Sequence, residues 1–198
     1  MADRAVYVAL LRGINVGGNA RILMADLREI ATSVGFADVA TYIQSGNLIF
    51  TAERAAGSGA DFAAETAMAG AIRAAILGRL GLDVDVMVRR AAELVEAVAA
   101  NPFPDADPKR LLFVFLSEPP SAEARQALKA IDAAPEEVAL TDRTAYLHLP
   151  NGIGRAVLPT ILERRLGVRG TGRNLDTVRT LVAMSDDVGT GPVGESRH

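Results

Sequence analysis

The stretch Arg12-Gly13-Ile14-Asn15-Val16-Gly17-Gly18-Asn19 decides how the surrounding chain folds. It follows an apolar run, Ala5 to Leu11, that predicts a buried first strand, and it precedes an amphipathic helix that begins near Leu23. A glycine-rich loop between a strand and a helix can adopt positive φ angles and bring its backbone N–H groups close to a bound group. The loop therefore predicts a ligand site but names no ligand.

Outward from this loop, residues 1–90 predict the order β-α-β-β-α-β. Apolar residues recur at helical spacing from Leu23 to Val34 and again from Phe62 to Leu80. The remaining elements are short strand-like runs, at 39–43, 48–51 and 84–88.

The second half of the chain repeats this order. A short helix over 91–100 and the proline-rich stretch 101–108 predict a linker over 91–110. Residues 111–185 predict a second β-α-β-β-α-β unit with an extra C-terminal helix, whose last strand begins at 168–169, and 186–198 predict a flexible tail. The predicted fold class is α+β, with two tandem ferredoxin-like (split βαβ) subdomains and antiparallel sheets.

Composition narrows the possible chemistry. The 198 residues are 49% hydrophobic, which is enough for a substantial core. The absence of cysteine excludes disulfides, thiolate metal sites and cysteine nucleophiles. No basic apolar leader and no apolar run of ~20 residues are present, so we expect a cytoplasmic protein with no membrane partner.

Charge is unevenly distributed. The net charge of −3 argues against a general polyanion binder, yet seven arginines and only two acidic residues lie between Arg143 and Ser185. A basic terminal third can mark a phosphate or nucleic-acid surface, or it can be a solvated helix face.

Four motifs occur in an order that resembles a known family. They are Leu10-Leu11-Arg12-Gly13-Ile14-Asn15-Val16-Gly17-Gly18, Thr41-Tyr42-Ile43-Gln44-Ser45-Gly46-Asn47, Asn101-Pro102-Phe103 and Thr171-x-Arg173-Asn174-x-x-Thr177-Val178. Together they resemble the bacterial domain of unknown function family 1697, over nearly the whole chain. The resemblance implies tandem ferredoxin-like subdomains and no established activity. The chain departs from the family pattern at Leu175, where an aromatic residue is usual, and at Ala156, where a serine is usual.

The loop itself is neither a Walker A sequence nor Gly-x-Gly-x-x-Gly. What remains is an anion cradle of backbone donors with the Arg12 guanidinium, and its candidate residues are Arg12, Asn15, Gly17 and Gly18. Alternatively, the glycines only make a tight turn and Arg12 pairs with a carboxylate.

Gln44, Ser45 and Asn47 form a polar trio in the predicted hairpin turn. Turn chemistry alone explains such residues, although they can also hold a base or a sugar. In a split βαβ unit we expect this turn at the sheet end opposite the loop after the first strand. The two motifs then share a site only if the turn folds over or a neighbouring domain brings it close.

Thr171, Arg173, Asn174 and Thr177 precede and open the last helix. Asn174 is a natural N-cap with Thr177 at the third helical position. A cation at a helix N-terminus is unfavourable, and a bound anion or a carboxylate would relieve it. We therefore expect Arg173 and Arg12 to be the paired cations of one inter-subdomain site.

Catalytic residues are sparse. His148 alternates in phase with Tyr146 on a strand and is expected to be structural or superficial, and no metal cluster or cofactor motif is present. Three functions stay open: binding of a phosphorylated small molecule or nucleotide at an inter-subdomain cleft, nucleic-acid binding, and an enzyme acting on a phosphorylated substrate. Against nucleic acid, neither half shows the strand aromatics that stack on bases.

Overall fold

The computed structural model describes residues 3–15, 21–54 and 60–190. The chain divides into two compact units: unit 1 comprises Met1–Leu94 with Thr180–His198, and unit 2 comprises Val95–Arg179. The division falls inside helices α3 (Ala91–Ala99) and α6 (Leu175–Thr190), so each of these helices contributes to both units.

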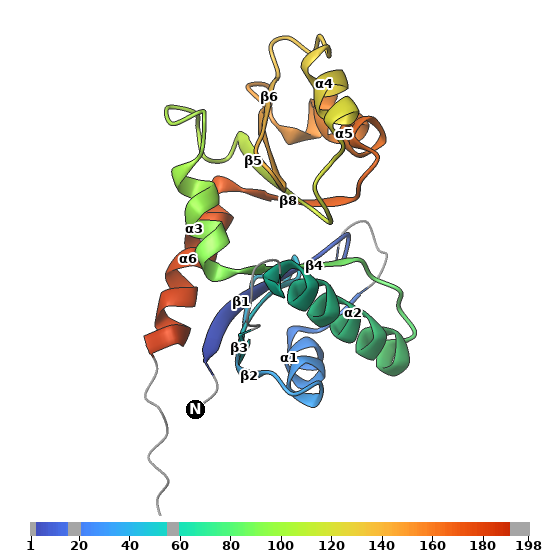
Figure 1. The fold of residues 1–198 in the computed structure, drawn as a ribbon, viewed down its shortest axis with the longest axis vertical. Coiled ribbons are helices and arrows are strands. Elements are labelled where there is room, and N and C mark those ends of the chain that lie inside the picture. Colours follow the sequence, from blue (N-terminus) through green and yellow to red (C-terminus); the bar gives the residue numbers. More distant parts are fainter. Residues whose placement is uncertain (1–2, 16–20, 55–59, 191–198) are drawn as a thin grey trace, which may run out of the picture. The chain divides into compact units, whose positions relative to one another are not determined.

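Unit 1 is a four-stranded antiparallel sheet with two helices on one face (Figure 1). Its strands lie in the order β2-β3-β1-β4. In chain order its elements are β1 (Arg4–Leu11), α1 (Met24–Ser33), β2 (Ala37–Tyr42), β3 (Asn47–Glu53), α2 (Ala60–Leu80) and β4 (Val86–Arg90).

The core of unit 1 follows from strand alternation. Every second residue of β1, namely Tyr7, Ala9 and Leu11, packs on the helices. From α1 and α2 the same cluster takes buried side chains at helical spacing, among them Leu27, Ile30, Ile72 and Ile76. The periodicity that predicted these helices is therefore the periodicity that buries them.

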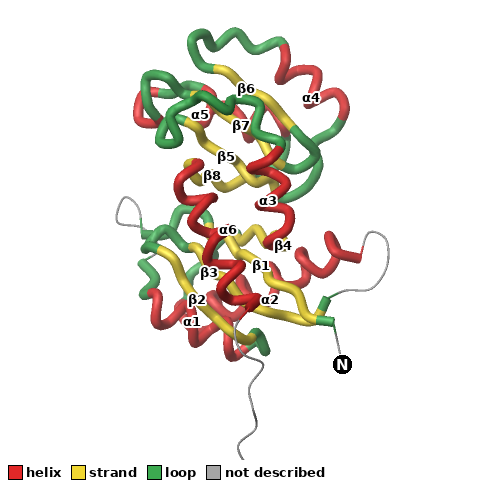
Figure 2. The backbone as a smooth tube through the Cα atoms, turned by 90° about the vertical axis from the view of Figure 1, so that its left-hand side faces the viewer, coloured by secondary structure: helices red, strands yellow, loops and turns green. Residues whose placement is uncertain are grey.

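Unit 2 has the same element order and an equivalent sheet. Its four strands lie side by side in the order β6-β7-β5-β8, and all neighbours are antiparallel (Figure 2). Its elements are β5 (Leu111–Leu116), α4 (Ala122–Lys129), β6 (Glu137–Leu140), β7 (Thr144–His148), the short 3-10 helix Ile153–Arg155, α5 (Leu158–Leu166) and β8 (Gly170–Asn174). The α+β class with antiparallel sheets is confirmed.

Two predicted strands lie further along the chain than expected. The strand predicted at 84–88 is β4, and antiparallel pairing from Leu11–Val86 to Tyr7–Arg90 sets its ends. The strand predicted to begin at 168–169 is β8, so the Thr171–Asn174 segment is itself a strand paired with β5. In both cases the partner strand sets the ends, which local sequence does not reveal.

The proline-rich part of the predicted linker is a run of turns within unit 2. Phe103 N–H donates to Asn101 Oδ1 (3.0 Å), and Arg110 N–H donates to the Asp107 carbonyl (2.8 Å). Leu149 N–H then donates to the Arg110 carbonyl (2.8 Å), which attaches the segment to the end of β7. Within the described ranges, no helix has the length and apolar character needed to cross a membrane.

Candidate functional site

The β2–β3 turn and the loop after β1 lie at the same end of the first sheet. The prediction of opposite ends is wrong, because β3 runs antiparallel to β1 and so begins where β1 ends, with Leu10 paired to Asn47. Leu11 N–H donates to the Gly46 carbonyl at 2.8 Å. Two motifs that are about thirty residues apart along the chain therefore meet without any rearrangement.

Asn15 ties the loop to this turn. Its side-chain Nδ2 donates to the Gln44 carbonyl (2.7 Å) and to the Ile22 carbonyl (3.0 Å), while Ile22 N–H donates to its Oδ1 (3.0 Å). One amide thus closes the loop between residues 15 and 22 and attaches it to the turn. This role explains an asparagine here, because the group must donate and accept at once.

The backbone at this sheet end is strained. Asn15 (φ +56°) and Ile43 (φ +46°) adopt left-handed conformations, which are rare for residues other than glycine and rarest for β-branched ones. Gly46 (φ +78°) is also left-handed, and a Cβ there would lie 2.7 Å from the Leu11 and Ile14 side chains. Strained backbone of this kind concentrates at ligand clamps and active sites.

The polar trio of the turn divides into one structural and two more accessible residues. Asn47 is fully buried, and its Nδ2 donates to the Tyr42 carbonyl (3.1 Å) and to Ser45 Oγ (3.0 Å). Gln44 is exposed and Ser45 is half-buried. Asn47 therefore shapes the turn, whereas Gln44 and Ser45 can reach a ligand.

Arg12 pairs with a carboxylate, as the structural alternative predicted. Its guanidinium lies 3.7 Å from Asp85 Oδ2, and 43% of its side chain is exposed. Asp85 is itself 3.8 Å from Arg73, which makes a two-pronged contact with Asp83 (2.6 and 2.8 Å). Hydrogen bonding to Asp83 raises the pKa of Arg73. Gly17 and Gly18 lie outside the described residues.

Arg173 lies in unit 2, on β8, with 8% of its surface exposed. Its NH1 donates to Thr171 Oγ1 (2.9 Å) and to the Gly172 carbonyl (2.8 Å). Burial lowers the pKa of its guanidinium to about 10. The predicted cap is confirmed, since Thr177 N–H donates to Asn174 Oδ1 at 2.9 Å. Arg12 and Arg173 belong to different units, and their shared site stays a prediction.

A second buried arginine, Arg89, was missed by the sequence argument. It is the penultimate residue of β4, as Arg173 is of β8, and its NH1 also donates to the preceding carbonyl, that of Val88 (2.8 Å). The Glu93 carboxylate lies 3.8 Å from its Nε. Aligning the two predicted units strand by strand would have identified the pair. Across the described ranges, no group of three or more His, Asp or Glu side chains can hold a metal ion.

The chain is thus an α+β protein with two four-stranded antiparallel sheets. The same fold is found in the conserved bacterial protein SP0830 from Streptococcus pneumoniae, which aligns with a TM-score of 0.69 and 21% sequence identity over 92% of this chain and 99% of that chain. This likeness is one of fold alone.

The family model for proteins of unknown function, DUF1697, matches residues 5–146, and the chain belongs to this family. The match includes the loop motif, the turn motif and Asn101-Pro102-Phe103, but it ends before the Thr171–Val178 segment. No curated protein matches the chain.

Proposed function

We propose that this protein binds an anionic, phosphorylated small molecule or nucleotide where the loop after β1 meets the β2–β3 turn. The observation that carries the proposal is the Asn15 side chain, whose Nδ2 donates to the Gln44 carbonyl of the turn (2.7 Å) and to the Ile22 carbonyl at the far end of the loop (3.0 Å). A single amide that ties residues 15 and 22 to a strained turn pre-organises the polar side chains of that turn.

Arg12 supplies the cation for such a ligand. Its contact with Asp85 is long and partly exposed, and pairs of this kind contribute little stability. If Arg12 turns toward a phosphate, Asp85 keeps Arg73 as a neighbour at 3.8 Å. The exchange therefore leaves no isolated carboxylate, and a guanidinium binds phosphate through two parallel hydrogen bonds.

The turn supplies neutral contacts. Asn15 donates to the carbonyl of Gln44, and Ser45 follows directly in the chain. Both Gln44 and Ser45 have surface that a ligand can reach. An amide and a hydroxyl can each donate or accept, which suits a sugar or a base attached to the phosphate. A nucleotide is for this reason a better match than inorganic phosphate.

We also infer that each unit is ferredoxin-like. The order β-α-β-β-α-β, the strand orders β2-β3-β1-β4 and β6-β7-β5-β8, and the wholly antiparallel pairing support this assignment. In such a split βαβ arrangement the first loop and the central turn share one sheet end, which is the geometry that the proposed site uses.

Nucleic-acid binding has less support. Aromatic residues do occur on the strands, but Tyr7, Phe50, Phe113, Phe115 and Tyr146 are each at most 1% exposed, and Tyr42 at the end of β2 is only half-buried. Bases stack on exposed rings, so the buried side chains offer no platform. An enzyme acting on a phosphorylated substrate with the same residues remains the further alternative, and turnover that is lost in Arg12→Ala would indicate it.

The proposal is tested by a thermal-shift screen of nucleotides and phosphorylated metabolites against the parent protein and Arg12→Ala. A ligand at about a hundred times its Kd adds ~2.7 kcal/mol to stability. Loss of the charge-assisted contact should weaken binding by roughly tenfold or more. Arg54→Ala is the matched control, because Arg54 is an exposed arginine at the opposite end of the same sheet, paired with Asp3.

Equal weakening in Arg12→Ala and Arg54→Ala would show only a loss of general attraction, and no shift with any phosphorylated compound would refute the proposal. Arg173→Gln, measured by thermal shift with the same ligand, tests the predicted pairing of Arg12 and Arg173. Unchanged affinity there would confine the site to unit 1.

A further inference from the structure

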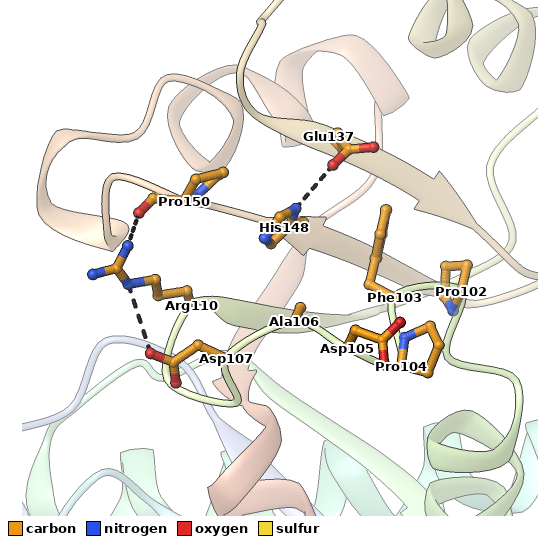
Figure 3. Close-up of a pocket in the computed structure, with 10 residues that line it drawn as sticks. All are labelled: Pro102, Phe103, Pro104, Asp105, Ala106, Asp107, Arg110, Glu137, His148 and Pro150. Atoms are coloured by element: carbon orange, nitrogen blue, oxygen red, sulfur yellow. Dashed lines mark hydrogen bonds and ion pairs between the residues drawn. The ribbon is translucent and has the colours of Figure 1, made fainter.

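Unit 2 contains a pocket of about 560 Å³ that none of the predicted site residues lines. Figure 3 shows the turns over 102–110 on one side of it, and the ends of β6 and β7, with Glu137 and His148, on the other. The volume lies within the range of small-molecule sites, ~300–1,000 Å³. The stretch that sequence predicted to be a linker therefore forms one wall of a pocket.

A histidine–carboxylate pair forms the opposite wall. Glu137 and His148 are directly opposed across β6 and β7, and His148 Nδ1 lies 2.9 Å from Glu137 Oε1. In a neutral imidazole, a carboxylate at Nδ1 favours the proton on that nitrogen and leaves Nε2 as a hydrogen-bond acceptor. Three-quarters of the His148 side chain is buried, so its ring position is well restrained.

An aromatic ring stands beside this pair. The Phe103 and His148 ring centroids are 5.6 Å apart with an interplanar angle of 33°. Phe103 is fixed by Asn101, whose Oδ1 accepts from the Phe103 N–H and whose Nδ2 donates to the Phe103 carbonyl (3.3 Å). Prolines 102, 104 and 150 add apolar surface to the same lining.

The charge of the lining is negative. Three carboxylates, those of Asp105, Asp107 and Glu137, face one guanidinium, that of Arg110. Arg110 is already engaged, because its Nε lies 3.7 Å from Asp107 and its NH1 donates to the Pro150 carbonyl. Carboxylates, an imidazole acceptor and an aromatic face all favour a cation and disfavour a phosphate.

We propose that this pocket binds an organic cation, namely a primary amine on a short alkyl stem. The ammonium group donates to the Glu137 carboxylate, which His148 Nδ1 holds in place, and the stem packs on the Phe103 ring and the prolines. This ligand has the opposite charge to the one proposed for unit 1, so either binding can fail without the other.

Three probes of equal stem length test the charge requirement: n-butylamine, n-butanol and pentanoate, each titrated into the full chain and followed by backbone amide NMR shifts. We expect n-butylamine to shift the amides of the non-proline residues of 103–110 and of residues 137 and 148, and to bind at least ~10-fold more tightly than the other two. A fourth probe, Nα-acetyl-lysine methylamide, carries the same amine on a lysine side chain. Tighter binding of this probe than of n-butylamine indicates a lysine of a peptide as the ligand, and weaker binding indicates a free amine.

Two variants test the residues. Glu137→Gln keeps a hydrogen-bond partner for His148 but loses the charge, and we expect it to weaken n-butylamine by ~10-fold. Phe103→Leu keeps apolar bulk but loses the ring face, for an expected loss of ~3-fold. The matched control is Glu118→Gln, an exposed carboxylate of the same unit outside the pocket.

Equal binding of n-butanol and n-butylamine overturns the proposal, because the pocket is then only an apolar groove. Equal weakening in Glu137→Gln and Glu118→Gln also overturns it, since it indicates general attraction. A third contrary result is the absence of pocket shifts with either amine in a chain whose spectrum shows both units folded. Retained amine binding in Arg12→Ala separates this pocket from the proposed phosphate site.

Discussion

Two equivalent sheet ends, one in each unit, share their backbone scheme and differ in their side chains. In unit 1 the backbone N–H of Leu11, the last residue of β1, donates to the Gly46 carbonyl of the turn. The backbone N–H of the next residue, Arg12, donates to the Asp85 carbonyl (2.9 Å). In unit 2 the backbone N–H of Leu116 donates to the Arg143 carbonyl (2.9 Å), and the backbone N–H of Ser117 donates to the Arg169 carbonyl (2.8 Å). The repeated topology therefore places the same hydrogen bonds at both ends.

The turns at these two ends are held by different means. In unit 2 an arginine from α4, Arg125, donates to the Thr141 carbonyl (2.8 Å) and to the Asp142 carbonyl (2.7 Å), and none of the described turn residues there has a positive φ. In unit 1 the clamp is Asn15, inside the loop itself, and the turn carries the left-handed residues Ile43 and Gly46. Strain at only one of two equivalent ends indicates that it is not required by the fold, which supports a functional role for that end.

The largest expected effect comes from Gly46→Ala. A methyl group would meet Leu11 and Ile14 at 2.7 Å in a left-handed backbone, so we expect a loss of about 3 kcal/mol or more in the free energy of unfolding. Gly13→Ala is the control, because its φ is +67° and it has nothing within 4 Å, and it should cost only ~1 kcal/mol. Urea denaturation compares the two, and equal losses would show that close packing of the turn is unimportant.

Asn15→Ala should follow in size. It removes three hydrogen bonds and keeps an unfavourable positive φ, for an expected loss of about 2–3 kcal/mol. Asn15→Gly relieves the backbone but still lacks the amide, so it separates strain from hydrogen bonding. If Asn15→Gly is more stable than the parent protein, the amide clamp contributes less than the backbone strain costs, and the contrast between the two ends weakens.

Buried tyrosines give a smaller contrast between the units. Tyr146 OH donates to the Ala97 carbonyl (3.0 Å), so Tyr146→Phe should cost about 1 kcal/mol. Tyr7 is fully buried, and its hydroxyl has no hydrogen-bond partner among the residues that the structure describes. We therefore expect Tyr7→Phe to be neutral or stabilising, as measured by thermal unfolding. A large loss there would reveal a bound water or ligand at Tyr7.

The smallest expected effect is a pH dependence. Burial, with Asp61 as the next cause, raises the pKa of Tyr7 above its ordinary 10.0. The folded chain then holds the Tyr7 proton more tightly than the unfolded chain. The contribution of this proton to the free energy of unfolding is therefore complete below pH 10 and is lost as the pH rises through the pKa of Tyr7 in the folded chain. Relative to Tyr7→Phe, the parent protein should lose stability above about pH 10. Parallel curves of stability against pH for the parent protein and Tyr7→Phe would contradict this expectation.

Local signals were sufficient for much of the fold. Helical spacing from Leu23 to Val34 and from Phe62 to Leu80 predicted α1 and α2. Asn174 was identified as a cap because capping depends only on residues three apart. The candidate site fared less well, since the turn was predicted at the wrong sheet end.

What the sequence determined by itself was the class of each segment, because helix, strand and turn preferences act between residues a few positions apart. Only the tertiary structure decided which segments meet. Antiparallel pairing brought Gln44 to Asn15, and the β6–β7 register placed Glu137 opposite His148. These contacts depend on strand register, which the whole sheet sets and no short stretch of sequence records.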